Sequence, residues 1–275
     1  MVYQMQITIL CDNNTLTYVP EPSFLGEPGF SVLIDDGDER ILFDCGYTDV
    51  FLQNAEHLGI SFDTVTKIAF SHGHDDHTGG LKYLLPRIRK GTDLYAHPET
   101  FCEKLRGRES VGSAYRADDL AGFCTMHLSK GPQKISEHLT FLGEIPSLND
   151  FEPRKQFDMK RGDGGSLIPD FVTEDTALVY EDEEWIFIIT GCSHAGICNI
   201  AEYAARLSGK PVRGILGGFH MKDADVRTAK TIAYFKEHRI TDLYPCHCVS
   251  FAVKAAIDRV LPIHECGAGV KIVVD

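Results

Sequence analysis

Short apolar runs separated by turn residues predict strands in the first third of the chain. MQITILC, FSVLI and VTKIAF each keep apolar side chains over the length of a strand. The Asp-Asp-Gly-Asp of residues 35–38 predicts a hairpin turn between strands at 31–34 and 41–43. Residues 48–59 repeat their apolar side chains at helical spacing and end in a glycine, which predicts a helix.

The same rhythm of strands and helices returns in the second half. TALVYEDEEWIFIITGC predicts a hairpin that turns at residues 181–184, and a helix is expected from about 197 to 207. VRGILGGFH and ITDLYPCHC predict two strands separated by the helix TAKTIAYFKEHR. A helix near 250–260 and the strand GVKIVVD end the chain. We therefore expect the two halves of the chain to share one architecture of strands and helices, with histidines at the ends of strands.

Residues from about 100 to 170 lack this rhythm. Glycine, proline and charged side chains are frequent there, and KISEHLTFLGEI alone shows a regular pattern. Long connections without periodicity are uncommon in compact domains and often carry function. We therefore expect a single domain over residues 1–275, with a lid-like insertion at about 100–170.

Composition and charge favour a globular protein and disfavour nucleic acid as its main partner. The chain has 275 residues, of which 43% are hydrophobic and 24% charged, as in ordinary globular domains. Its net charge of −13 repels a phosphate backbone. Neither a signal-peptide pattern nor an apolar run of membrane-spanning length is evident. We expect a cytoplasmic protein that acts on a small molecule, with no nucleic-acid or membrane partner, and leave its oligomeric state open.

The cysteine count agrees with a reducing compartment. The nine cysteines are an odd number, and most are scattered without the spacing of a disulfide framework. Most are therefore expected to be reduced thiols that fill small spaces in the core.

The stretch SHGHDDHTGG at residues 71–80 concentrates three histidines and two aspartates. His72 and His74 alternate on an extended segment and can point the same way, and Asp76 and His77 begin the next helix and face the same point. Imidazole and carboxylate at this spacing suit a divalent transition metal. The alternative is a polar loop that caps a helix, but a cap needs one aspartate rather than three histidines. We interpret the stretch as a metal site.

These residues and several other segments resemble a known family. SHGHDDHTGG is similar to the His-x-His-x-Asp-His signature of the metallo-β-lactamase superfamily, and ILFDCG resembles the segment before its metal loop. LYAHPE, TGCSHAGICNI, GGFHM and PCHC resemble its dihydropteroate-synthase-like branch of metal-dependent hydrolases. The resemblance implies a four-layer αββα sandwich with one or two divalent metal ions at one edge of its two sheets.

The resemblance also implies which side chains bind metal. The residues that match the signature directly are His72, His74, Asp76 and His77. His247 stands where the superfamily places its last metal histidine, so we assign it to the second metal. The histidine motif usual between the two is missing from residues 100–185, and His194 is our candidate for the vacant position at the first metal.

Cys192 departs from the family pattern, because the superfamily normally has a bridging aspartate at this place. The thiol is either a soft ligand or a small wall of the site, and we expect the second. Cys246 and Cys248 flank His247 on an expected strand, so both should point away from its ring.

Three further side chains are candidates for supporting roles. His220 ends an apolar strand beside two glycines and is a proton donor to the leaving group, a further metal ligand or a core histidine. We assign it as catalytic together with Asp76, which could both ligate and orient a water molecule. Asp44 is expected to hydrogen-bond the metal loop or a metal-bound histidine. For His97, which precedes a proline, a structural role is favoured.

The expected chemistry is attack by water that a metal ion has activated. Zinc fits the nitrogen ligands best, and iron and manganese are alternatives. Our first hypothesis is a metal-dependent hydrolase acting on an ester, lactone or phosphoester. A pterin-type transferase that joins a dihydropterin pyrophosphate to an arylamine, and a metal-binding sensor without turnover, are the alternatives. Arginines and lysines in the 100–170 segment suit an anionic substrate, and a solvated loop is the equally favoured alternative.

Overall fold

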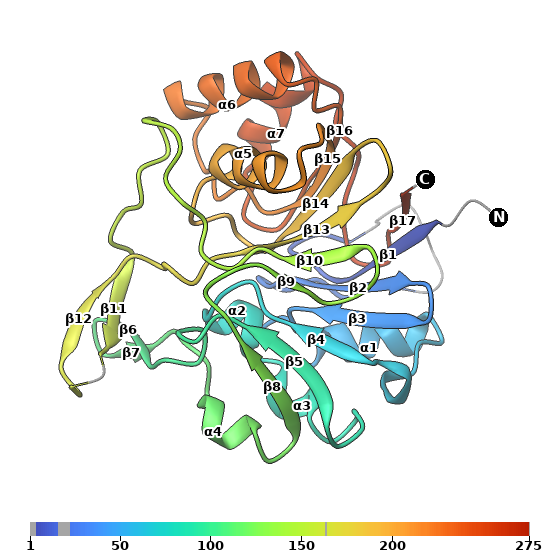
Figure 1. Cartoon of the computed structure of the whole chain (residues 1–275), viewed down its shortest axis with the longest axis vertical. Coiled ribbons are helices and arrows are strands. Elements are labelled where there is room, and N and C mark those ends of the chain that lie inside the picture. The colour runs from blue at the N-terminus through green and yellow to red at the C-terminus, as the bar shows by residue number, and fades with distance from the viewer. Residues whose placement is uncertain (1–3, 16–22, 163, 275) are drawn as a thin grey trace.

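The computed structural model describes residues 4–15, 23–162 and 164–274 and arranges them in two facing sheets with helices on both outer sides (Figure 1). The seven-stranded sheet has the order β17 (Lys271–Val274), β1 (Met5–Cys11), β2 (Ser31–Asp36), β3 (Glu39–Phe43), β4 (Lys67–Ala69), β5 (Thr92–Ala96) and β8 (Cys124–Leu128). The six-stranded sheet has the order β16 (Asp242–Pro245), β15 (Val212–Gly217), β14 (Ile186–Thr190), β13 (Ala177–Glu181), β10 (Leu139–Phe141) and β9 (Gln133–Lys134).

Helices cover the outer face of each sheet. The elements beside the seven-stranded sheet are α1 (Val50–His57), η1 (Phe62–Thr64), α2 (Asp75–Thr78), α3 (Leu81–Leu84) and α4 (Ala117–Leu120). The elements beside the six-stranded sheet are α5 (Ile197–Ser208), α6 (Val226–Glu237) and α7 (Phe251–Asp258). This is the four-layer αββα arrangement that the resemblance to the superfamily implies. None of the helices in the described ranges is long and apolar enough to cross a membrane.

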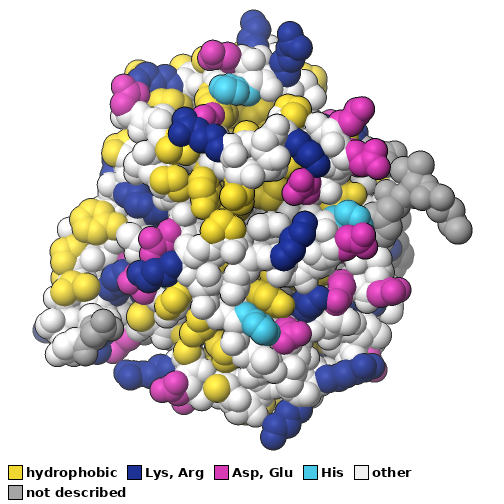
Figure 2. Space-filling view, viewed as in Figure 1, with side chains coloured by type: hydrophobic (Ala, Val, Ile, Leu, Met, Phe, Trp, Pro, Cys, Tyr) yellow, Lys and Arg dark blue, Asp and Glu magenta, His cyan; other side chains and the backbone are white. Residues whose placement is uncertain are grey.

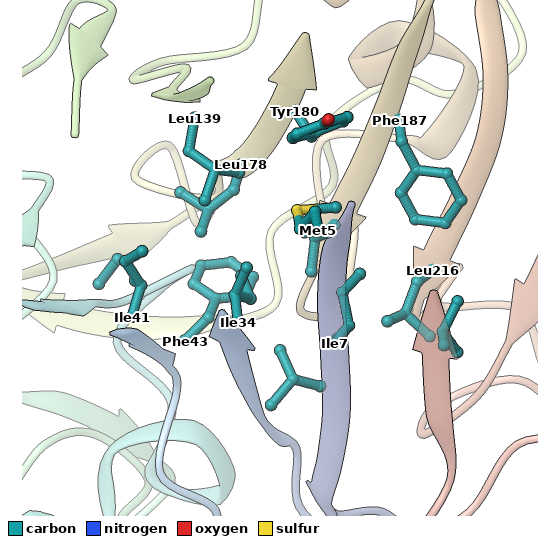
Figure 3. Close-up of a cluster of buried hydrophobic side chains, with 14 of the residues drawn as sticks. Met5, Ile7, Ile34, Ile41, Phe43, Leu139, Leu178, Tyr180, Phe187 and Leu216 are labelled. Carbon is teal, nitrogen blue, oxygen red and sulfur yellow. The ribbon is translucent and has the colours of Figure 1, made fainter. Parts of the chain in front are cut away.

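The main core lies between the two sheets (Figure 3). Met5 and Ile7 of β1 share one buried cluster with Leu178 and Tyr180 of β13. Because side chains alternate across a strand, residues two apart point to the same layer. Each fully buried aliphatic side chain of this kind contributes about 1.5–3 kcal/mol, and the sandwich depends on their sum.

A third, small sheet stands to one side of the sandwich (Figure 1). Its order is β12 (Leu167–Asp170), β11 (Asp158–Arg161), β6 (Lys104–Arg106) and β7 (Glu109–Ser110). Lys104 anchors it, because its fully buried ammonium pairs with Asp170 at 2.5 Å and Glu174 at 2.6 Å. Figure 2 shows apolar side chains gathered on this side of the molecule, and Leu167, Ile168 and Phe171 are about two-fifths exposed.

The expected insertion at 100–170 is smaller in the structure. Within it, β8 completes one main sheet and β9 and β10 complete the other, so only the small sheet and its connections stand apart. The sequence analysis did not assign these strands to the main sheets. β10 lies within the regular stretch KISEHLTFLGEI, but no local pattern shows which sheet a strand joins.

Two strand ends also differ from their expected positions. The hairpin turn is confined to residues 37–38, where Gly37 has a φ of +66°, so β2 and β3 extend further than expected. β16 ends at Pro245, and residues 246–248 leave the strand. The last residue of the expected C-terminal strand, 275, lies outside the described residues.

Candidate metal centre

The SHGHDDHTGG segment forms a tight loop after β4 that only glycines can form. A Cβ at Gly73 would lie 2.2 Å from the Thr100 carbonyl oxygen, and one at Gly80 would lie 2.0 Å from that of Cys45. Real Cβ atoms do not approach so closely. The glycines therefore let the loop pack against neighbouring backbone and bring its side chains to one edge of the sandwich.

Three imidazoles of this edge form a first group. The Nε2 of His72 lies 2.9 Å from the Nδ1 of His74. The ring of His194, which comes from the loop after β14, has its centroid 4.9 Å from the centroid of each of these two rings. Its Nε2 is buried and has no hydrogen-bond partner among the described residues. The structure thus brings His194 to the place where a third ligand was expected.

Asp76, His77, Cys192 and His247 form a second group, whose ligand atoms lie within 4.8 Å of one another. The Nε2 atoms of His77 and His247 are 3.2 Å apart. The Sγ of Cys192 is 3.3 Å from the first nitrogen and 3.2 Å from the second. An Asp76 oxygen is 3.5 Å from His247 Nε2 and 3.8 Å from His77 Nε2.

Both groups fit the metal ions that the resemblance implies. Two nitrogens held about 2.0–2.1 Å from one tetrahedral ion stand roughly 3.3 Å apart, and the two nitrogen pairs here are 2.9 and 3.2 Å apart. The donors are imidazole, carboxylate and thiol, which suit divalent transition metals. His72, His74 and His194 would hold one ion, and Asp76, His77 and His247 a second.

Burial and neighbouring charges shift the pKa values of these candidate ligands in different directions. Burial, together with the neighbouring imidazoles, lowers the pKa values of His72 and His194 well below the usual range, so both are neutral at pH 7. Burial also acts to lower the pKa of His77, but Asp76 and Asp44 outweigh it and raise that pKa to about 9. Burial acts to raise the pKa of Asp76, and His77 and His247 hold it below its ordinary value. Metal binding should therefore release the His77 proton.

Asp44 hydrogen-bonds residues of the histidine loop, as the sequence analysis predicted. His77 Nδ1 donates to an Asp44 oxygen at 2.6 Å, and Ser71 donates to the same carboxylate through its backbone N–H and its hydroxyl. This hydrogen bond leaves the Nε2 of His77 to face the metal position. Asp44 itself has a φ of +58°, a conformation that aspartate and asparagine tolerate better than most residues.

Asp44→Asn is expected to weaken metal affinity about 10–100-fold, the usual effect of losing such a partner. The amide keeps the size and backbone preference of aspartate but lacks the charge that holds the ring. A metal-chelator competition titration measures the change. Asp93→Asn is the matched control, because Asp93 pairs with His127 at 2.7 Å on the surface; equal losses in both variants would contradict the assignment.

Asp158 supports His74 and was missed by the sequence analysis. An Asp158 oxygen lies 3.6 Å from His74 Nε2, the nitrogen that faces away from His72, and Arg106 donates two hydrogen bonds to this carboxylate at 2.9 and 3.0 Å. Burial acts to raise the pKa of Asp158, but His74 and Arg106 lower it to about 2. The residue belongs to β11, whose contact with the metal loop no local pattern reveals.

Two residues that the sequence analysis did not identify also contact His247. Its backbone N–H donates to Asp12 at 2.7 Å, and its Nδ1 lies 2.8 Å from the Asn13 side-chain oxygen. Both partners follow the last residue of β1, on the other sheet. Only the packing of the two sheets brings them to the ring.

The expectation for the two flanking cysteines is right for Cys246 and wrong for Cys248. Cys246 lies fully buried in the core between the sheets. Cys248 instead groups with Cys192 and His220, with all three ligand atoms within 4.8 Å of one another. His247 has a φ of +52°, so alternation along a strand no longer applies at this point.

The position of Cys192 favours a metal ligand, the alternative that the sequence analysis did not expect. Its sulfur belongs to both candidate groups around the metal positions, so we now expect it to bind metal. Cobalt-substituted protein should show a sulfur-to-cobalt charge-transfer band in its absorption spectrum. Cys192→Ser should remove the band, and Cys102→Ser, a half-buried thiol elsewhere, should keep it. A wild-type spectrum without the band would make Cys192 a wall of the site.

A cleft of about 850 Å³ opens over these groups. His220 reaches it from the end of β15, with its ring centroid 4.3 Å from that of His194 and 5.3 Å from that of Phe157. Its Nδ1 is buried, and the described part of the chain offers it no hydrogen-bond partner. Arg106 and Lys222 also line the cleft.

His97 does not join the cleft. Its Nε2 lies 3.0 Å from a Glu144 oxygen, and its Nδ1 accepts the backbone N–H of Glu99 at 3.0 Å. Both ring nitrogens therefore have protein partners, which agrees with the structural role that the sequence favoured.

Known proteins are similar to this chain in sequence and in fold. Residues 25–192 match the family model of the metallo-beta-lactamase superfamily. A solved structure described as a metal-dependent hydrolase of the beta-lactamase superfamily is 30% identical, with 98% of each chain covered and a TM-score of 0.82.

Two relatives come from Methanocaldococcus jannaschii. An uncharacterised protein is 31% identical, with 89% of this chain and 91% of the relative covered. The other, 7,8-dihydropterin-6-methyl-4-(beta-D-ribofuranosyl)-aminobenzene-5'-phosphate synthase, is 30% identical over 83% of each chain. By its family match, its fold and the arrangement of its histidine-rich edge, the chain belongs to the metallo-β-lactamase superfamily.

Proposed function

We propose that this protein is a metal-dependent hydrolase that acts on an ester, lactone or phosphoester. The observation that carries the proposal is that two neighbouring donor groups, His72–His74–His194 and Asp76–His77–His247, border one cleft. The cleft is lined by His74, Asp76, His194 and His247. A divalent ion held by these residues would activate water and so supply a nucleophile at neutral pH. Zinc suits the nitrogen donors best, with iron and manganese as alternatives.

The protein's own residues would position the reactants. Asp76 lines the cleft beside both His77 and His247 and could accept a hydrogen bond from the attacking water. His220, from the loop after β15, would give a proton to the leaving group. The cations of Arg106 and Lys222 and the half-exposed ring of Phe157 supply a wall that suits an anionic small molecule. Because Phe157 and Asp158 belong to the small sheet or its edge, we propose that this sheet is the lid over the site.

The test is a substrate panel with metal-reconstituted protein. Esters, lactones, phosphomonoesters and phosphodiesters are offered in turn, and turnover of one class is expected that a chelator abolishes and added metal restores. Failure of the whole panel, with metal bound stoichiometrically, would contradict the hydrolase and favour a sensor.

A pterin-type transferase is the second candidate, and the similarity to the dihydropterin-related synthase favours it. In this reaction an arylamine rather than water would displace a pyrophosphate from a dihydropterin. Incubation with a dihydropterin pyrophosphate, with and without an arylamine, separates the two functions by product mass. A coupled product would establish the transferase, whereas the free hydroxymethyl pterin would establish hydrolysis.

A further inference from the structure

Cys192 and Cys248 meet although they follow strands that are not neighbours. Cys192 comes shortly after β14 and Cys248 shortly after β16, and β15 lies between the two strands. Adjacent strands are about 4.8 Å apart, so their ends should be separated by roughly 9–10 Å. The two sulfurs nevertheless lie within 4.8 Å of each other.

Glycines at the end of β15 account for this approach. Gly217 ends the strand and Gly218 follows it. A Cβ at Gly218 would lie 2.5 Å from the Cys248 sulfur and 2.6 Å from the Gly191 carbonyl oxygen. The missing side chain leaves the space that the Cys248 sulfur occupies, and this sulfur is 3.6 Å from the Cys192 carbonyl oxygen.

The pair is open to small molecules and stands in two loops. Both residues line the cleft of about 850 Å³ over the metal positions. Cys248 is half-buried, whereas Cys192 is 3% exposed. Neither residue lies in a helix or a named strand. The sulfurs could therefore close to the 2.03–2.05 Å of a disulfide, about 2.8 Å nearer at most, through a shift of two loops.

We propose that Cys192 and Cys248 are a redox-active thiol pair that a low-molecular-weight disulfide converts into an intramolecular disulfide. In the first step the Cys248 thiolate attacks the external disulfide, whose S–S bond breaks and releases one thiol. In the second step the Cys192 thiolate attacks the Cys248 sulfur of this mixed disulfide and releases the second thiol. The protein loses two electrons and two protons, and the external disulfide gains them as two thiols.

The modification reaches the metal centre through Cys192. This sulfur lies 3.2–3.3 Å from the ring nitrogens of His77 and His247, and once bonded to Cys248 it is no longer a thiolate donor. Oxidation should therefore weaken metal binding, and bound metal should protect the thiols. This consequence rests on the proposed role of Cys192 at the metal centre, whereas formation of the disulfide does not.

The test treats metal-free full-length protein with oxidised glutathione and follows thiols and peptides. Wild type is expected to lose two of its nine titratable thiols to a disulfide and to yield a peptide pair that joins residues 192 and 248. Cys248→Ser and Cys192→Ser should each fail to form this pair. Cys102→Ser, which removes a half-buried thiol outside the group, should still form it. Zinc-loaded wild type should keep both thiols under the same treatment.

Two results would overturn the proposal. The first is glutathione attached to Cys102 while residues 192 and 248 stay reduced in metal-free protein. The second is a disulfide that joins either residue to a different cysteine. A 192–248 disulfide that leaves zinc stoichiometry unchanged would keep the thiol pair and contradict only its coupling to the metal centre. The thiols are read by mass spectrometry and zinc by elemental analysis, so none of these results depends on the protein hydrolysing a substrate.

Discussion

Replacing His72 and His74 together by alanine is expected to abolish stoichiometric metal binding. These rings supply the nitrogens that face each other at 2.9 Å, and the first position would keep too few donors to hold an ion with its usual four ligands. The neighbouring Asp76 and His77 belong to the same loop, so the second position should weaken as well. Elemental analysis of protein purified without added metal measures the content of each ion.

The matched control replaces two histidines outside the site. His127 pairs with Asp93 at 2.7 Å and His138 with Asp36 at 2.9 Å, so the variant with His127→Ala and His138→Ala also loses two imidazoles beside carboxylates. It should keep its metal. An unchanged metal content in the His72→Ala, His74→Ala protein would refute the ligand assignment, and equal losses in both proteins would show a general effect on folding.

His220→Ala is expected to lower turnover about 10²–10⁴-fold, the usual range for the loss of a positioned acid or base. The ring stands over the first metal group, 4.3 Å from the ring of His194 between centroids, and its buried Nδ1 meets no partner within the described ranges. A proton donor is not needed for metal affinity. Metal content and melting temperature should therefore stay near wild type while kcat falls.

A second variant is needed because the backbone of His220 is left-handed. His220 has a φ of +47°, and asparagine tolerates this left-handed conformation better than alanine does. His220→Asn should therefore fold as wild type does and still lack the proton donor. Loss of metal in both variants would make His220 a ligand, and full activity in both would make it a structural histidine.

Much of the fold could be predicted from the sequence, because the evidence for it is local. The apolar periods of β1, β13 and α5 follow from side chains a few positions apart, which is the range over which strand and helix geometry repeat. The histidine loop is local in the same sense. His72, His74, Asp76 and His77 lie within six residues, so their spacing alone directs them to one point. The resemblance to the superfamily then added His194 and His247.

Only the tertiary structure determined the contacts between residues that are far apart in the sequence. These contacts depend on the order of the strands and on the backbone conformation of single residues. His77 and His247 meet although 170 residues separate them, and Asp158 reaches His74 from a small sheet without a periodic signal. Cys248 reaches Cys192 because His247 turns the chain out of its strand and Gly218 leaves room for the sulfur. Sequence spacing predicts the direction of side chains only over a few residues. The distance between residues at the common edge of the two sheets depends on which strands are neighbours. The sequence therefore identified the histidines and Asp76 of the candidate site. The contact of Cys192 with Cys248 and the contact of Asp158 with His74 became visible only in the packed sheets.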